Sequence, residues 1–389
     1  MDLAQRVQQL KPSATLAVSA MAQELKAAGR EIISLSLGEP DFNTPAHIRQ
    51  AAIKAIDEGF THYTAVPGIP ELRKAASGYF NTLYQAGSAP ENILISNGGK
   101  QALFNLFLAV LNPGDEALIP APYWVSYPPM VELAGAVPVT VPAGVEKGFK
   151  VTPEDLERYR SPKTRLLLIN SPSNPSGALY SRAEADALAA WAVENKILLV
   201  ADEIYDQLVY TPEGHASFAP WWKKHPEYFC IANGVAKSFA MTGWRVGYLL
   251  ANPEIIKACN KLQSQSTSNV CSIAQKAALA ALEGGLDCLA EMREAFIRRR
   301  DLCMEMIASW PGVQCPKPLG AFYLFPDMRA VYNEKIPDSP ALCKFLLEKA
   351  GVALVPGQAF GDDNCVRISY ATSDDLLRKA MGKIAEVLF

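Results

Sequence analysis

Short apolar runs alternate with longer amphipathic segments through the middle of this chain, and this alternation constrains its fold more than any other feature. The runs are rich in Val, Ile and Leu along their whole length: NILIS, EALIP, TRLLLIN, KILLVADE, EYFCIAN and GYLLA. Helical patterns such as QALFNLFLAVL and EADALAAWAVEN lie between several of them. Strands that are apolar on both faces suit a parallel sheet covered by helices on both sides. The middle of the chain is therefore expected to be α/β.

The pattern changes towards the C-terminus. After about residue 253 it becomes helical and ends in the charged segment EMREAFIRRRDLCMEMIASW, which predicts a long connecting helix. The short strands GAFYLF, GVALVP and CVRISYA and two helices then predict a small α+β unit. The amphipathic LAVSAMAQELKAAG is expected to pack against it. We expect residues 1–45 to be an N-terminal arm and part of a small domain, 46–285 a large ligand-binding domain, and 286–389 the C-terminal small domain.

Composition excludes several classes of function. The chain has 389 residues, of which 20% are charged, and a net charge of -3, so it lacks the basic excess expected of a nucleic-acid-binding or membrane-surface protein. Its eight cysteines form no CxxC pair, and its four histidines do not flank them at metal-ligand spacing. We expect reduced thiols and no metal. No apolar stretch reaches membrane-spanning length, and MDLAQRVQQLKPS has no signal-peptide core, so a cytoplasmic protein is expected.

A candidate anion site lies in ISNGGKQALFNLFLAVL, where Gly98, Gly99 and Lys100 join a strand to a helix. The first N–H groups of a helix have no intrahelical acceptor, and the helix dipole favours an anion such as phosphate there. A tight turn alone would also explain the two glycines, so both interpretations remain open at this point.

A lone lysine is the second candidate. Lys237 lies among small and apolar residues in NGVAKSFAMTGWRVGYLL, and Arg245 follows eight residues later. Desolvation lowers the pKa of a lysine and makes its amine nucleophilic. A side chain that reaches out to solvent is the alternative. Asp202 ends the apolar run KILLVADE, with Tyr205 three residues on. A buried carboxylate needs a partner such as a protonated ring nitrogen, although a helix N-cap is an equal alternative.

Three more residues complete the set. Trp124 in PYWVSYPPM follows a strand and offers an indole face to a flat ring, unless it belongs to the core. Asn174 in NSPSNPSG lies between prolines in a loop that follows a strand, which is also typical of a simple turn. Arg367 lies inside the apolar CVRISYA and predicts a carboxylate partner. Together these groups suit pyridoxal 5′-phosphate (PLP), a flat ring with a phosphate, a ring nitrogen and an aldehyde.

The same motifs resemble a known family, the class I aminotransferases of the aspartate aminotransferase superfamily (fold type I). The resemblance runs from LKPSATLAV to VRISYA and includes SLSLGEPDFNTP, HYTAVPGIPELR, ADEIY and AKSFAMTGWRVGY. It is nearest to the bacterial aspartate aminotransferase subgroup that includes bifunctional aspartate/prephenate enzymes. It implies a mostly parallel seven-stranded sheet between helices in the large, PLP-binding domain, plus the smaller α+β domain. It also implies a homodimer with shared active sites.

The resemblance also implies roles for individual residues. Lys237 resembles the lysine that binds PLP covalently and moves a proton, and Asp202 resembles the partner of the ring nitrogen. Tyr205 and Asn174 resemble the donors to the phenolic oxygen, and Trp124 the residue that stacks on the ring. The phosphate side is implied to consist of Gly98, Gly99, Lys100, Arg245 and Tyr63, the last from the neighbouring subunit.

On the substrate side, Arg367 resembles the residue that binds the α-carboxylate, assisted by the Gly38 backbone. Trp124 and Asn174 are implied to line the same substrate pocket. Lys100 and Lys11 are associated in this subgroup with a distal carboxylate. One departure is Gly234, where many members carry a phosphate-binding serine; Ser238 is a candidate replacement.

The implied reaction is a ping-pong exchange of an amino group between an L-amino acid, aspartate or glutamate, and a 2-oxo acid such as 2-oxoglutarate, oxaloacetate or prephenate. Alternatives are an aminotransferase for aromatic, alanine or methionine substrates, a PLP lyase or α-oxoamine synthase of the same fold, and a cofactor-sensing regulatory module.

Overall fold

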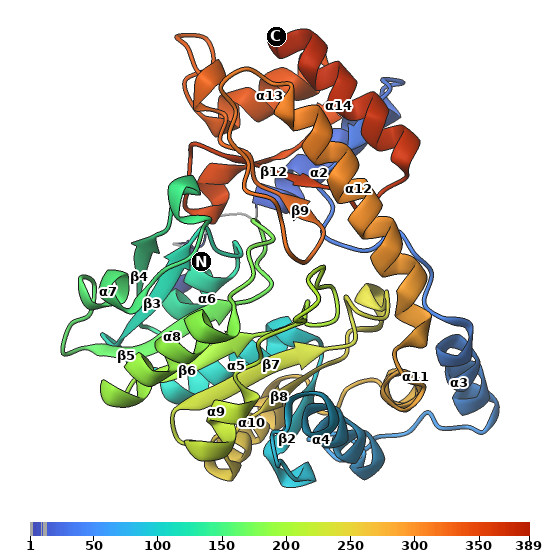
Figure 1. The fold of residues 1–389 in the computed structure, drawn as a ribbon. Helices are drawn as coiled ribbons and strands as arrows, with labels where there is room; N and C mark the ends of the chain where they lie inside the picture. Colours follow the sequence, from blue (N-terminus) through green and yellow to red (C-terminus); the bar gives the residue numbers. More distant parts are fainter. Residues whose placement is uncertain (1–2, 9, 11–13) are drawn as a thin grey trace.

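The computed structural model describes residues 3–8, 10 and 14–389 of the chain. Its central feature is a seven-stranded mixed sheet with the strand order β2-β8-β7-β6-β5-β3-β4 (Figure 1). β8 is antiparallel to both of its neighbours, and the remaining pairs are parallel. The strands are β2 (Ile93–Ser96), β3 (Glu116–Ala121), β4 (Val137–Pro142), β5 (Thr164–Asn170), β6 (Leu198–Asp202), β7 (Phe229–Gly234) and β8 (Gly247–Leu250). The predicted α/β fold class is confirmed.

Alternating residues of each central strand enter two different hydrophobic cores. In β5, Leu167 and Ile169 pack into one core and Leu166 and Leu168 into the other. Because both faces of the sheet are covered, both sets of side chains must be apolar, which explains the uninterrupted apolar runs. β4 differs because it is an edge strand in which Val141 alone is buried, and prolines are tolerated at a sheet edge.

Helices cover both faces of this sheet (Figure 1). The core on one face contains residues of α5, α6 and α10, and the core on the other contains residues of α4, α8 and α9. These helices are α4 (Pro70–Tyr84), α5 (Gly99–Val110), α6 (Tyr127–Leu133), α8 (Arg182–Glu194), α9 (Ala219–Lys224) and α10 (Pro253–Ser266). The other helices of this half are α3 (Ala46–Asp57), α7 (Pro153–Glu157) and α11 (Ser272–Glu283).

The C-terminal part forms a second, smaller layer. Its antiparallel sheet has the order β11-β12-β9, and a further strand, β10, pairs in parallel with β1 near the N-terminus. The strands are β1 (Ile33–Ser34), β9 (Tyr323–Leu324), β10 (Val352–Ala353), β11 (Val355–Pro356) and β12 (Val366–Ser369). The helices of the N- and C-terminal parts are α1 (Gln5–Gln8), α2 (Ala14–Ala27), α12 (Ala290–Ala308), α13 (Ser339–Lys349) and α14 (Asp374–Leu388). The long helix α12 connects the two parts (Figure 1).

Residues 36–44, which we call the strap, follow β1 and contact both the C-terminal part of the molecule and the part that contains the large sheet. On the small-domain side, both oxygens of Asp41 accept hydrogen bonds from Arg299 of α12, at 2.7 and 2.9 Å. On the other side, Thr44 donates to the carbonyl of Ala240 at 2.7 Å and accepts from the Trp244 indole at 3.0 Å. The strap is therefore tied to both parts of the molecule.

In the described part of the chain, no helix is long and apolar enough to cross a membrane.

Candidate active site

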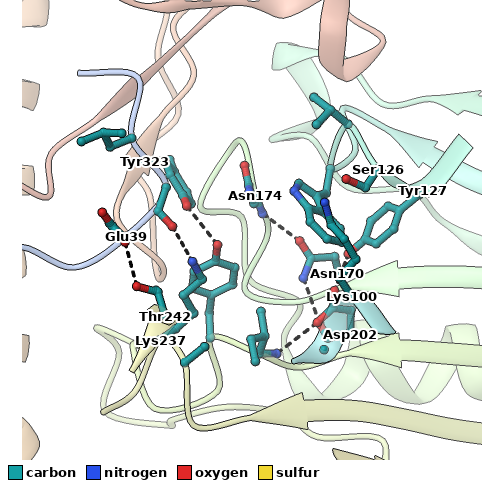
Figure 2. Close-up of a pocket in the computed structure, with 18 of the residues that line it drawn as sticks. Glu39, Lys100, Ser126, Tyr127, Asn170, Asn174, Asp202, Lys237, Thr242 and Tyr323 are labelled. Carbon is teal, nitrogen blue, oxygen red and sulfur yellow. Dashed lines mark hydrogen bonds between the residues drawn. The ribbon is translucent and has the colours of Figure 1, made fainter. Parts of the chain in front are cut away.

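A cavity of about 470 Å³ lies at the carboxyl edge of the large sheet, against the strap and the small domain (Figure 2). Open parallel sheets bind their ligands at this edge. The predicted site residues that line the cavity are Gly38, Gly99, Lys100, Trp124, Asn174, Asp202, Tyr205, Lys237, Arg245 and Arg367. The fold thus brings ten residues from well-separated motifs to one cavity.

Lys237 reaches the cavity from the loop that follows β7. Its amine donates a hydrogen bond to the carbonyl of Gly38 in the strap (Figure 2). Burial and, to a lesser extent, the positive charge of Arg367 lower the pKa of Lys237 to about 8, whereas Glu39 opposes the shift. A substantial fraction of the amine is therefore neutral, and able to act as a nucleophile or base, near neutral pH.

Asp202 is the last residue of β6 and is 6% exposed. It accepts hydrogen bonds from the Tyr127 hydroxyl at 2.7 Å and from the backbone N–H of Ile204 at 3.2 Å. Burial raises the pKa of Asp202 to about 6, while these hydrogen bonds act in the opposite direction. A carboxylate held in this way would be stabilised by a cation in the cavity.

The start of α5 forms an anion cradle with Arg245. Gly98, the N-cap, has a φ of +86°, and a Cβ added there would lie 2.5 Å from Nη2 of Arg245. The positive φ favours glycine at this position, and a larger residue would displace the guanidinium of Arg245. The N–H groups of Gly99 and Lys100 lie in the first turn, where helical N–H groups have no intrahelical acceptor. A guanidinium beside a helix N-terminus suits a phosphate group.

The amine of Lys100 lies 4.8 Å from the centre of the Trp124 ring. Burial lowers the pKa of Lys100, with a further contribution from the positive charge of Arg245. The two residues therefore form a cationic and aromatic wall on one side of the cavity.

Arg367 is buried on β12 at the opposite side of the cavity. It donates to the Asn174 side-chain oxygen at 3.1 Å and to the carbonyl of Ser36 at 2.6 Å. Its guanidinium lies 4.7 Å from the Tyr323 ring centre, and Tyr323 shares a 3.0 Å hydrogen bond with Tyr205. A planar cation in this setting can bind a carboxylate through both of its N–H edges.

Three predicted residues lie outside the cavity lining. Gly98 is the N-cap of α5 and lies next to the guanidinium of Arg245. Tyr63 is 93% exposed and does not line the cavity, so any contribution from it must be made elsewhere. Lys11 lies outside the described residues.

The structure also explains Gly234. This residue ends β7 opposite Gly247 of β8, and a Cβ added to it would lie 2.9 Å from both the Gly247 Cα and the Val246 carbonyl oxygen. A serine does not fit at this position without movement of the backbone. Ser238 is 1% exposed, and neither a hydrogen-bond partner for its hydroxyl nor a place in the cavity lining is found among the described residues.

Sequence reasoning missed several residues that line the cavity. Tyr127 lies three positions after Trp124 in PYWVSYPPM, and Asn170 is the last residue of TRLLLIN. Glu39 follows Gly38, and its carboxylate accepts a 2.7 Å hydrogen bond from Thr242 (Figure 2). Tyr323 comes from GAFYLF in the small domain. A polar residue at the end of an apolar strand is the signal that points to Asn170.

The cavity residues fit PLP in their chemistry. The cradle of Arg245 and α5 suits a phosphate, the buried Asp202 suits a protonated ring nitrogen, and the indole of Trp124 suits a flat ring. The partly neutral amine of Lys237 suits an aldehyde carbon.

Comparisons with known proteins agree with this chemistry. Residues 30–384 match the family model for aminotransferase class I and II. An aspartate/prephenate aminotransferase of Cereibacter sphaeroides is 48% identical over 98% of this chain and 97% of its own. An aspartate aminotransferase of Bacillus subtilis is 46% identical over 99% and 98%, respectively. The structure of the Thermus thermophilus aspartate aminotransferase with maleate superposes with a TM-score of 0.94, at 46% identity over 100% of both chains.

Proposed function

The chain belongs to the class I and II aminotransferases, which are PLP-dependent, and we propose that it exchanges an amino group between aspartate or glutamate and a 2-oxo acid. The acceptor would be 2-oxoglutarate or oxaloacetate, with prephenate as a further acceptor, since a similar protein is an aspartate/prephenate aminotransferase. The observation that carries the proposal is the convergence of Lys237, Asp202 and Arg367 on one cavity at the carboxyl edge of the sheet.

We assign the cofactor contacts from the chemistry of the cavity. The amine of Lys237 would hold the aldehyde carbon, and the carboxylate of Asp202 would hold the ring nitrogen in its protonated form. Asn174 and Tyr205 would donate to the phenolic oxygen, and Trp124 would stack on the ring. Gly98, Gly99, Lys100 and Arg245 would form the phosphate side. When bound, PLP accepts the electron pair that remains on the substrate carbon after a proton leaves.

Lys237 would move that proton. Its free amine would act as the general base for the proton on the substrate Cα, and the resulting ammonium would donate a proton to the PLP carbon that reacts with amines. Its pKa of about 8 suits both roles, since base and conjugate acid are both present near neutral pH.

Arg367 and the Gly38 backbone would hold the α-carboxylate of the substrate, and Trp124 and Asn174 would line the same pocket. Lys100 would attract a second carboxylate, at the far end of the substrate side chain. We therefore propose a dicarboxylic substrate. Lys11 is proposed for the same role on the basis of the family resemblance alone.

The proposal also includes a homodimer. Tyr63 would reach the active site of the neighbouring subunit and bind the phosphate group of the cofactor there. This arrangement accounts for its high exposure in the single chain. We further propose the domain division 1–45, 46–285 and 286–389, and a cytoplasmic location.

The proposal is tested by spectroscopy of the PLP-loaded protein. Addition of L-aspartate or L-glutamate should convert the absorbance of the bound cofactor from that of its lysine-bound form to that of its amine form, and 2-oxoglutarate should restore the first spectrum. Lys237→Ala should lose turnover while it retains some cofactor. A panel of aromatic amino acids, alanine and methionine measures specificity. Failure of every amino acid to change the spectrum would contradict the proposal, and release of ammonia would identify a lyase instead.

A further inference from the structure

Asn170 is the last residue of β5, and its register partner on β6 is Asp202, the last residue of that strand. It is half-buried and lines the cavity between Asn174 and Asp202 (Figure 2). It is not assigned to any contact with cofactor or substrate in the proposed function. Its position between two residues that do have such roles suggests an indirect one.

The amide of Asn170 joins two main-chain segments. Its oxygen accepts a hydrogen bond from the backbone N–H of Asn174 at 2.8 Å, and its nitrogen donates to the backbone carbonyl of Asp202 at 2.9 Å. A backbone N–H can only donate and a carbonyl can only accept, so these partners fix the orientation of the amide. An apolar side chain at position 170 would break both bonds at once.

Of the two main-chain segments that Asn170 joins, the loop that contains Asn174 depends more on this residue than the end of β6 does. The carbonyl of Asp202 has a second donor, the N–H of Ser171 at 3.2 Å. For the N–H of Asn174, Asn170 is the acceptor found in the described part of the chain. Because Pro172 and Pro175 have no N–H, few other bonds can tie this loop to the sheet. Loss of Asn170 would therefore release the loop at 171–177 more than the end of β6.

Asn174 in turn contacts Arg367, whose guanidinium donates to its side-chain oxygen at 3.1 Å. We propose that Asn170 is a positioning residue that holds Asn174 in register with Asp202, and thereby sets both the contact of Asn174 with the cofactor and the orientation of Arg367 towards the substrate carboxylate. This inference rests on the proposed function.

Asn170→Ala tests it in the PLP-loaded protein. Because Asn174 would no longer be held as a donor to the phenolic oxygen, the pH at which the absorbance of the bound cofactor changes should shift upwards. Because Arg367 would lose its fixed partner, the dissociation constant for maleate should rise by about tenfold. The cofactor-free protein supplies an independent measurement: hydrogen–deuterium exchange should become faster in residues 171–177.

Asn92→Ala is a matched control. Asn92 is also half-buried, and its amide likewise accepts from one backbone N–H (Ala89, 2.9 Å) and donates to one backbone carbonyl (Ala251, 3.3 Å). It does not line the cavity. Its removal should lower the melting temperature but leave the absorbance transition, maleate binding and exchange at 171–177 unchanged.

Asn170→Asp separates the two halves of the bridge. It keeps an acceptor for the Asn174 N–H but loses the donor to Asp202, so exchange at 171–177 should remain slow. If Asn170→Ala leaves the absorbance transition, maleate binding and loop exchange as in the wild type, Asn170 is not a positioning residue. A wild-type protein that fails to change its spectrum with any amino acid would instead overturn the proposed function, while the exchange measurement would still judge the role of Asn170 in the loop.

Discussion

At the scale of single residues, burial determines the charge of Lys237. Its pKa is lowered to about 8 from 10.5, chiefly by desolvation and then by the charge of Arg367. In the cofactor-free protein, labelling of Lys237 by an amine-reactive reagent should therefore rise with pH around a midpoint near 8, as measured by peptide mass spectrometry. Surface lysines should follow the ordinary value of about 10.4.

Two observations would check the cause of this shift. Glu39→Gln removes a charge that raises the pKa of Lys237, so the midpoint should fall. A wild-type midpoint near that of surface lysines would contradict the prediction.

The lowered pKa of Lys237 also affects stability. Between about pH 8 and 10.5 the unfolded chain binds more protons at this lysine than the folded protein does, so the contribution of Lys237 to the free energy of unfolding rises with pH.

Sequence reasoning found the residues whose neighbours in the chain mark them. Lys237, Asp202 and Arg367 each interrupt an apolar context, and a buried charge needs a partner wherever the chain folds. Tyr127 could not be found in this way, because its role depends on a hydrogen bond to Asp202, 75 residues away. Its ring also belongs to the hydrophobic core, and the sequence around it does not separate a core tyrosine from one that binds a carboxylate.

At the scale of elements, the spacing of β7 and β8 makes glycine necessary at position 234. Gly234→Ser should lower the free energy of unfolding by about 1–3 kcal/mol, since the new side chain meets the backbone of β8. Urea unfolding of the cofactor-free protein measures this change. Gly382→Ser, on α14 with no atom within 4 Å of the added Cβ, is the matched control and should change it by less than about 0.5 kcal/mol. A stable Gly234→Ser protein with tighter phosphate binding would contradict this interpretation.

The elements themselves were predictable to different degrees. The central strands follow from their apolar runs, because a strand covered on both faces has no polar side. The edge strand β4 (VPVTVP) is absent from those runs, because most of its side chains are partly or fully exposed and its prolines argue against a central strand. In the small domain, GAFYLF predicts a longer strand than the two residues of β9 that pair.

At the scale of the whole molecule, the exposure of Tyr63 leads to a test of the proposed dimer. We expect Lys237→Ala and Tyr63→Ala homodimers both to be impaired. In a heterodimer of the two, one site would combine Lys237 from one chain with Tyr63 from the other and be intact. Such a heterodimer, purified with two different tags, should recover about half of the wild-type activity. If Tyr63 served its own chain, neither site would be intact and no activity would return.

The overall architecture was predictable from the sequence, but the assembly was not. The alternation of strands and helices indicates an α/β fold, and the family resemblance supplied the number of strands. Nothing in the sequence of one chain measures whether Tyr63 faces solvent or a second subunit, because both situations allow an exposed tyrosine in the monomer.

The strap has a thermodynamic consequence. The carbonyls of Ser36 and Gly38, two residues apart, receive the guanidinium of Arg367 and the amine of Lys237. A ligand that draws either donor away changes the hydrogen bonding of the same short stretch of main chain. Ligands at the carboxylate position and at the lysine position therefore act on one peptide segment, and any coupling that this segment transmits is reciprocal: each ligand alters the affinity of the other by the same factor.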